Sequence, residues 1–126
     1  MYKNLTIISL LGVLAIALGA FGAHALKEVL TPQELASFET GVRYQMYHVI
    51  VLLFVTIFEG FTIAQKNKIS LVFLLGIFLF SGSIYAIHLT SVTAKQIWFV
   101  TPLGGVTLLL GWILMIVIFL KKAVKN

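Results

Sequence analysis

Four long stretches of the sequence are almost continuously apolar, and short polar segments separate them. The stretches cover residues 5–26, 43–64, 69–89 and 102–120. Each is close to the ~20 residues that a helix needs to cross a hydrocarbon core about 30 Å thick. Backbone groups must be satisfied internally in lipid, so continuous runs of this length predict helices rather than barrel strands. We therefore expect an all-α integral membrane bundle of four transmembrane helices, forming a single domain over residues 1–126.

The first apolar stretch also has features of a secretory signal peptide. Lys3 precedes it, and Ala23-His24-Ala25 has the small-x-small pattern of a cleavage site. A secretory core contains only about 7–15 apolar residues, and this stretch is longer. We expect it to be retained as the first membrane helix.

The second helix has a clear start signal on its polar side. Residues 31–34 read Thr-Pro-Gln-Glu, which places Thr at the N-cap, Pro at the first helical position and Glu at the third, a capping box. A straight helix from Pro32 to Ala64 would be about 50 Å long at 1.5 Å per residue. We therefore expect a bend near Gly41, with residues 32–40 forming a short amphipathic outer segment before the membrane.

Other local signals place the remaining connections and ends. Residues 65–68 predict a short polar turn between the second and third helices. Thr101-Pro102 predicts the start of the fourth helix. Glu59 is the only acid inside an expected span, where it either reaches toward water or couples to a proton. Trp112 lies deep in the fourth span, and its indole N–H requires a partner inside the bundle.

Composition and charge agree with a membrane protein. Hydrophobic residues make up 60% of the chain and charged residues only 10%, whereas a soluble domain carries about a quarter charged residues. Cysteine is absent, so the sequence predicts neither disulfides nor thiol chemistry. The net charge of +5 does not predict nucleic-acid binding, because the basic residues lie at the ends of apolar runs instead of forming a patch interleaved with aromatics.

The distribution of charge predicts the orientation. An even number of spans places both termini on one side of the membrane. That side contains six lysines: Lys3, Lys66, Lys68, Lys121, Lys122 and Lys125. The other side contains Lys27, Arg43 and Lys95, with Glu28, Glu34 and Glu39 nearby. The positive-inside rule then predicts a cell-membrane protein with both termini in the cytoplasm. The expected outer interface carries an aromatic belt of Tyr44, Tyr47, Tyr85 and Trp98.

Small residues recur at helical spacing and predict close helix packing. Ala15, Gly19 and Ala23 share one stripe of the first helix, at i, i+4 and i+8. The third helix has the pair Gly82 and Ala86, and the fourth has Thr107 and Gly111. Helices associate in membranes through the close approach of such residues. Packing within the chain is the favoured interpretation, and self-association is the alternative.

Polar residues gather toward the expected outer ends of the helices. They are His24, Arg43, Tyr44, Gln45, His48, Ser81, Tyr85 and His88. Polar side chains within spans usually face the bundle interior, and we expect the three histidines at a similar depth. A hydrogen-bonded structural cluster is favoured over a ligand or headgroup site, and both over a metal site, because no HxxxH or ExxH pair occurs. We assign no catalytic residue, cofactor or metal ligand.

Arg43 has two interpretations of its own. In the favoured one, its side chain reaches the outer interface or pairs with Glu39 one turn earlier. In the other, its guanidinium holds a lipid phosphate.

Several motifs together resemble a known family. They are GAFGAHAL (19–26), FETGVRYQMYH (38–48), LFSGSIY (79–85), TPLGG (101–105) and the following GW (111–112). These resemble the small membrane proteins typified by bacterial YwdK and YgdD, a domain-of-unknown-function family whose eukaryotic relatives include transmembrane protein 256. The resemblance implies a four-helix integral membrane protein, and it implies neither a reaction nor catalytic residues.

The sequence thus predicts a small membrane protein of unknown biochemical activity. We expect it to be non-enzymatic, to bind membrane lipid or a membrane-protein partner, possible homo-oligomers included, and to affect membrane organisation. No nucleophile–base pair or phosphate loop is recognisable, since Gly104-Gly105 lacks the rest of a phosphate-binding pattern. The alternative is a small oligomeric transporter or channel that uses the outer His/Arg/Tyr cluster.

Overall fold

A computed structural model of the chain describes residues 1–124. Over these residues it contains four long α-helices and one short 3-10 helix, in the order α1 (Tyr2–His24), η1 (Leu26–Glu28), α2 (Pro32–Ile57), α3 (Ile63–Leu89) and α4 (Val100–Ala123). Each of the four α-helices is long and apolar enough to cross a membrane. The expected all-α class with four membrane-spanning helices is confirmed.

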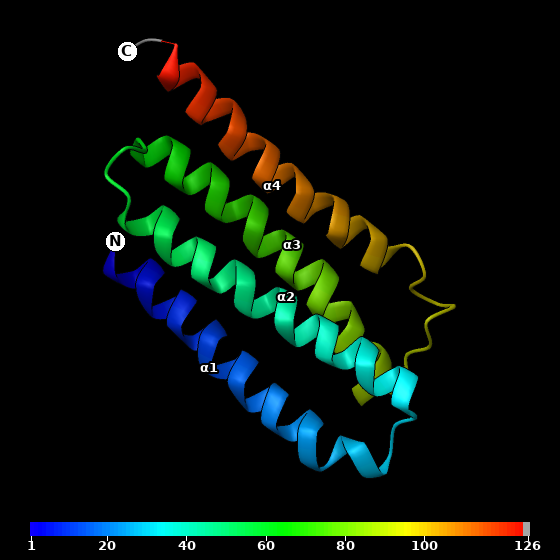
Figure 1. The fold of residues 1–126 in the computed structure, drawn as a ribbon. Coiled ribbons are helices and arrows are strands. Elements are labelled where there is room, and N and C mark those ends of the chain that lie inside the picture. Colours follow the sequence, from blue (N-terminus) through cyan, green and yellow to red (C-terminus); the bar gives the residue numbers. More distant parts are fainter. Residues whose placement is uncertain (125–126) are drawn as a thin grey trace.

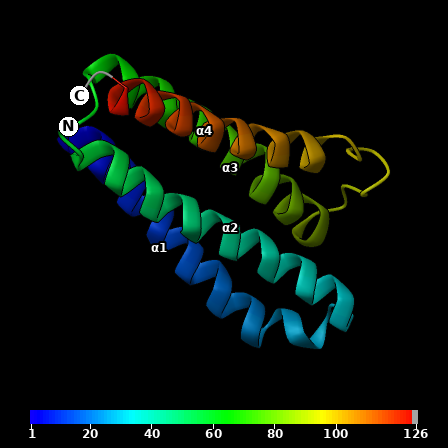
Figure 2. The same cartoon turned by 45° about the horizontal axis from the view of Figure 1, so that its top comes forward.

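The four helices lie side by side in chain order and alternate in direction (Figure 1). α1 packs on α2, α2 on α3, and α3 on α4, while α1 and α4 are not neighbours among the described residues. In Figure 2, α1 and α2 form one layer and α3 and α4 form another. The N-terminus, the connection between α2 and α3, and the C-terminal end of α4 all lie at one end of the molecule (Figure 1). The arrangement is therefore an open one, in which the first and last helices do not close a ring.

The apolar core lies mainly between α2, α3 and α4. Its fully enclosed side chains include Leu52 and Val55 of α2 and Ile69 and Phe73 of α3. α1 is buried only at Ile8, Ala15 and Gly22, which are spaced seven residues apart and form one narrow stripe. A helix that is apolar all round but buried on one stripe has lipid as its main neighbour.

The start of α2 agrees with the capping box in the sequence. The Thr31 hydroxyl accepts a hydrogen bond from the Glu34 amide (3.3 Å), and the Glu34 carboxylate accepts one from the Thr31 amide (2.9 Å). α2 begins at Pro32 as expected and continues as one uninterrupted helix through Gly41. Residues 32–40 are thus the first part of α2 and not a separate outer segment, and only η1 precedes the helix.

The end of α2 was predicted wrongly. The helix stops at Ile57, and residues 58–62 connect it to α3. The reason is a second capping box, in which Thr62 exchanges hydrogen bonds with Gln65 and so starts α3 at Ile63. Ending there, α2 is about 39 Å long at 1.5 Å per residue, so it needs no separate bent segment to fit.

Three smaller expectations change with these boundaries. Residues 65–68 are not a turn, because they belong to the first turns of α3. Glu59 lies in the exposed connection and not inside a span. α4 begins at Val100, so Thr101 is not its N-cap. The Thr101 hydroxyl instead pairs with Ser83 of α3 (2.6 Å).

Candidate functional site

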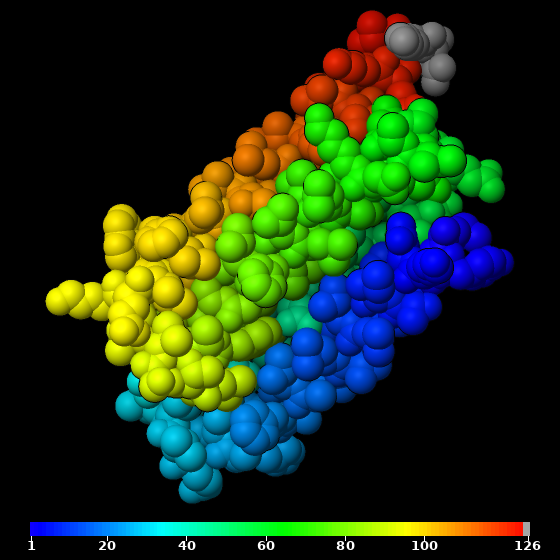
Figure 3. Space-filling model, turned by 180° about the vertical axis from the view of Figure 1, so that it is seen from behind, coloured from blue at the N-terminus to red at the C-terminus, as the bar shows by residue number. Residues whose placement is uncertain are grey.

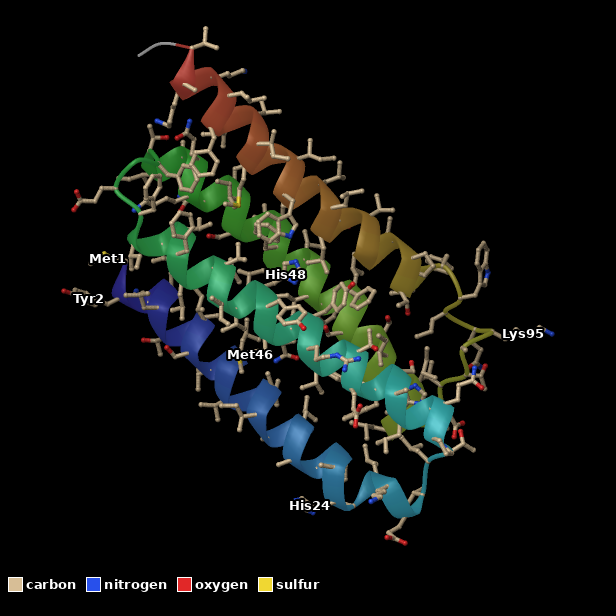
Figure 4. The ribbon with its side chains drawn as sticks, in the orientation of Figure 1. Met1, Tyr2, His24, Met46, His48 and Lys95 are labelled. Carbon is tan, nitrogen blue, oxygen red and sulfur yellow. The ribbon has the colours of Figure 1, made fainter. Side chains whose placement is uncertain are left out.

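The expected polar cluster is divided in the structure into separate groups. One surrounds His48 in the middle of α2, a second surrounds Gln45, and serines of α3 form further contacts. Figure 4 shows His48 within the helical array and His24 at its edge, far along α1. The residues therefore act at several helix interfaces and not at one shared site.

His48 has both ring nitrogens engaged inside the protein. It is only 5% exposed, and its Nδ1 lies 2.7 Å from the Tyr44 carbonyl oxygen. The Trp112 indole Nε1 donates to His48 Nε2 at 3.2 Å. An indole N–H only donates, so Nε2 is unprotonated and Nδ1–H donates to Tyr44. The geometry thus assigns a neutral Nδ1–H tautomer, and Trp112 has the interior partner that its depth requires.

Gln45 connects three helices. Its side chain is 1% exposed, and its Nε2 donates to the Leu11 carbonyl of α1 at 2.7 Å. Tyr85 of α3 donates its hydroxyl to Gln45 Oε1 at 2.8 Å. The Gln45 side-chain amide therefore links α2 to both α1 and α3 through hydrogen bonds. Because only i, i+4 relations within a helix can be read from sequence, this pairing between helices had no sequence signal beyond the buried polar residue itself.

Two serines of α3 form hydrogen bonds to the neighbouring helices α2 and α4. Ser81 donates to the Gly41 carbonyl of α2 at 2.6 Å. The Ser83 hydroxyl lies 2.6 Å from the Thr101 hydroxyl of α4 and donates to Phe80. Each interhelical hydrogen bond in a membrane protein contributes about 0.6 kcal/mol on average. Together with Gln45 they fix the register of the array.

The three histidines do not share a depth, contrary to expectation. His48 packs against Phe73, with ring centroids 5.3 Å apart, whereas His88 lies near Phe38 in the last turn of α3 (6.5 Å). Phe73 and His88 are separated by about 22 Å along α3 at 1.5 Å per residue. His24 is exposed at the end of α1. In residues 1–124 no group of three His, Cys, Asp or Glu side chains is placed to hold a metal ion.

Arg43 and the aromatic residues lie largely on the surface. The exposed Arg43 donates to the Thr40 hydroxyl (3.2 Å) instead of the expected Glu39. Tyr44, Tyr47 and Trp98 are exposed, as residues of an interfacial belt are. Tyr85 is different, because its hydroxyl points inward to Gln45.

The small residues of α1 face α2. Ala15 is buried, and a Cβ added at Gly19 would lie 3.3 Å from Val42 of α2. The third member of the expected stripe, Ala23, is exposed. Gly22 takes its place, because an added Cβ there would lie 3.0 Å from the Phe38 ring. This stripe therefore packs within the chain.

The tightest contact between helices joins α3 and α4, and two of its glycines, Gly104 and Gly76, were not expected from the sequence to mediate packing. A Cβ on Gly104 of α4 would lie 2.6 Å from the Phe80 Cα of α3, and one on Gly76 of α3 would lie 2.5 Å from Leu108 of α4. Gly111 faces the Phe73 ring in the same interface, so its expected role in packing is confirmed. The signal available was the seven-residue spacing of Gly104 and Gly111.

The other expected packing residues contribute less. The atom nearest to a Cβ on Gly82 would belong to Phe78 of the same helix, at 3.9 Å. Ala86 is half-buried, and so is Thr107. Thr107 donates its hydroxyl to Leu103 of its own helix. The expected pair on α3 thus does not mark the close contact, which lies at Gly76.

Comparisons with known proteins identify the family. Residues 18–105 match the family described as "Protein of unknown function (DUF423)". The UPF0382 membrane protein of Haemophilus influenzae is 39% identical over 115 residues, covering 88% of each chain. The UPF0382 inner membrane protein YgdD of Escherichia coli is 41% identical over 114 residues, covering 84% of this chain and 80% of that protein. No solved structure matches the chain significantly. The resemblance seen in the motifs is confirmed: this multi-pass membrane protein belongs to the DUF423 family, whose function is unknown.

Proposed function

We propose that this chain is a non-enzymatic protein of the cell membrane that binds membrane lipid or a membrane-protein partner and so influences membrane organisation. The observation that carries this proposal is the open arrangement of the helices. Among the described residues, α1 packs mainly on α2 and α4 mainly on α3, and α4 also reaches α2 through Trp112 and His48. Their outward faces are strongly apolar, with Leu10 62% and Leu109 58% exposed. Such faces interact with lipid chains or with the helices of a partner.

The polar interior supports a structural role for the buried side chains. Among residues 1–124, every buried side-chain nitrogen or oxygen has a hydrogen-bond partner. Both ring nitrogens of His48, and both the amide nitrogen and the amide oxygen of Gln45, bond to groups of the protein itself. Interaction at the outer faces is therefore better supported than chemistry in the interior.

The alternative of an oligomeric transporter or channel loses its main support. It relied on a cluster that included His24, His48 and His88. His24 is exposed on α1, and Phe73, which packs against His48, lies about 22 Å from His88 along α3 at 1.5 Å per residue. Among the described residues, the three histidines therefore form no common site from which to derive a pathway.

Native mass spectrometry of the protein, extracted gently from its own membrane, tests the proposed function. We expect a retained lipid or a partner subunit in the spectrum. A bare monomer in several mild detergents, each of which preserves the lipids of a control membrane protein, would contradict the proposal.

We further propose that both termini are cytoplasmic, because the end of the molecule that holds them carries most of the lysines. Lys3, Lys66, Lys68, Lys121 and Lys122 lie there, and Lys125 falls outside the described residues. Lys95 points away from the opposite end (Figure 4). This asymmetry agrees with the positive-inside rule.

The absence of cysteine makes this orientation directly testable. We expect a membrane-impermeant maleimide to label Lys95→Cys in intact cells whose outer barrier is permeable to the reagent. Lys68→Cys should react only after the membrane is opened. The reverse pattern would show that the termini lie outside.

A further inference from the structure

A groove runs along the face between α1 and α3, with α2 at its floor. Figure 3 shows this face, where part of α2 is visible between α1 (blue) and α3 (green). Three adjoining cavities of about 270, 350 and 300 Å³ make up the groove. Asn4, Asn67 and Ser70 line both the first and the second cavity. Ile7 and Leu74 line both the second and the third. The cavities are therefore continuous.

The chemistry of the groove changes along its length. The first cavity lies at the end that carries the termini, and polar groups surround it, including Lys66, Asn4 and Asn67. The third cavity is lined mainly by long apolar side chains such as Leu11, Leu14 and Ile77. A polar mouth that leads into an apolar channel matches an amphipathic molecule whose head remains at the membrane surface.

Lys66 is fixed at the polar mouth. Its half-buried ammonium donates to the Thr56 carbonyl, near the C-terminal end of α2, at 2.8 Å. An ammonium has three donors, so two remain for another acceptor. The side-chain amides of Asn4 and Asn67 line the same cavity and also donate hydrogen bonds. The mouth is therefore complementary to a phosphate group.

The shape of the groove favours an acyl chain over a helix of a second copy. Helices approach closely in membranes through small residues, but Gly19 and Gly22 of α1 face α2 and not the groove. The edges of the groove carry long side chains, among them Ile7, Leu71 and Phe78. A thin, flexible hydrocarbon chain fits between such side chains better than a helix does.

We infer that the groove between α1 and α3 binds an anionic phospholipid, with its phosphate at Lys66, Asn4 and Asn67 and one acyl chain beside Ile7 and Leu74. This inference rests on the proposed lipid-binding function and assigns to it a place and a lipid class. One leaflet is about 15 Å thick in its hydrocarbon part. At 1.5 Å per residue, that distance along α3 extends from Lys66 to about Gly76, so the chain passes Leu74.

Two matched pairs of variants test the head and the chain separately. Lys66→Gln removes the charge at the mouth, and Lys68→Gln removes an exposed neighbouring charge of the same helix. Leu74→Trp fills the groove, and Leu75→Trp adds the same bulk at an exposed position of α3 that does not line it. The probes are phosphatidylglycerol and phosphatidylcholine with identical acyl chains, and native mass spectrometry measures their retention.

We expect the wild-type protein to retain phosphatidylglycerol in preference to phosphatidylcholine. Lys66→Gln should lower phosphatidylglycerol retention about fivefold, because one basic side chain near an anionic headgroup contributes on that scale. Lys68→Gln should change it less than about twofold. Leu74→Trp should reduce retention of both lipids, whereas Leu75→Trp should match the wild type. Melting in detergent controls for folding, and if Leu74→Trp is unfolded, the lysine pair decides.

Other results would overturn the inference in distinguishable ways. If lipid is retained but each groove variant retains as much of it as its matched control, the lipid binds elsewhere. The proposed function then survives without this site. If the wild type retains a second copy of the chain and Leu74→Trp is a monomer, the groove is a self-association surface. If the wild type retains neither lipid nor partner, the proposed function fails together with the inference.

Discussion

Replacement of Gly104 by alanine should destabilise the protein by about 1–3 kcal/mol, the usual cost of overpacking a close-packed interface. The added methyl group would lie 2.6 Å from the Phe80 Cα and 2.7 Å from the Leu79 carbonyl carbon. Both obstacles belong to the backbone of α3, so no side chain can rotate to make room. The helices α3 and α4 would have to separate, and their shared contacts at Gly111 and Gly76 would loosen with them.

Gly105 provides a matched control in the next position of α4. A Cβ there would meet only the Phe80 ring, at 3.7 Å, an ordinary contact distance. In a helix, alanine is more favourable than glycine by about 0.5–1 kcal/mol. Gly105→Ala should therefore leave stability unchanged or raise it slightly, while at Gly104 the clash outweighs the same gain.

Equilibrium unfolding in mixed micelles, followed by circular dichroism, measures both variants. The expected order of stability is Gly105→Ala at or above the wild type, with Gly104→Ala well below both. Equal stabilities for the two variants would show that α3 and α4 do not approach as closely at Gly104 as the structure has them.

Hydropathy and capping residues were sufficient to predict the number of helices and the start of α2. Burial in lipid makes each span visible as an apolar run, and Thr31 and Glu34 mark a helix start through their own side chains. The end of α2 was harder to predict, because Phe58 and Phe61 continue the apolar run into the connection between α2 and α3. Hydropathy measures affinity for lipid and not backbone conformation, so it did not reveal that residues 58–62 leave the helix.

The candidate site depended on the register between helices, which a single helix does not encode. Tyr44 and His48 lie one turn apart on the same helix, so their contact follows from their spacing in the sequence. The level of His48 relative to α3 instead depends on where α2 ends and on contacts such as Ser81 with Gly41. A shift of one position also changes which side of a helix a residue faces, because successive residues turn by about 100°. That difference separates the exposed Ala23 from the buried Gly22.

Replacement of Gln45 by leucine should destabilise the protein by about 1–3 kcal/mol and loosen α1 in particular. The two shapes are similar, so the main change is the loss of hydrogen bonds to the Leu11 carbonyl and from the Tyr85 hydroxyl. Such bonds contribute about 0.6 kcal/mol each on average and up to about 1.7. The variant also leaves the Tyr85 hydroxyl without its partner, which adds a desolvation penalty.

Hydrogen exchange distinguishes this specific role of Gln45 from a general loss of stability. The hydrogen bond from Gln45 to the Leu11 carbonyl joins α2 to α1, and α1 otherwise packs through a narrow buried stripe. In Gln45→Leu, we expect hydrogen exchange to accelerate, relative to the wild type, more in residues 2–24 than in α4. Gln33→Leu, an exposed change in the same helix, should leave exchange unaltered. Uniform acceleration in both helices would contradict a specific link to α1.

A double-mutant cycle with Tyr85→Phe tests whether the two residues act as one unit. Tyr85→Phe alone removes one hydrogen bond and leaves Gln45 Oε1 without its donor. In the Gln45→Leu background that bond is already absent, so Tyr85→Phe should lower stability little. It could even raise stability, because it removes a hydroxyl that has lost its partner. The effects should therefore be clearly less than additive. Strict additivity would mean that Tyr85 and Gln45 stabilise the fold independently, and that the hydrogen bond between them contributes nothing measurable to stability.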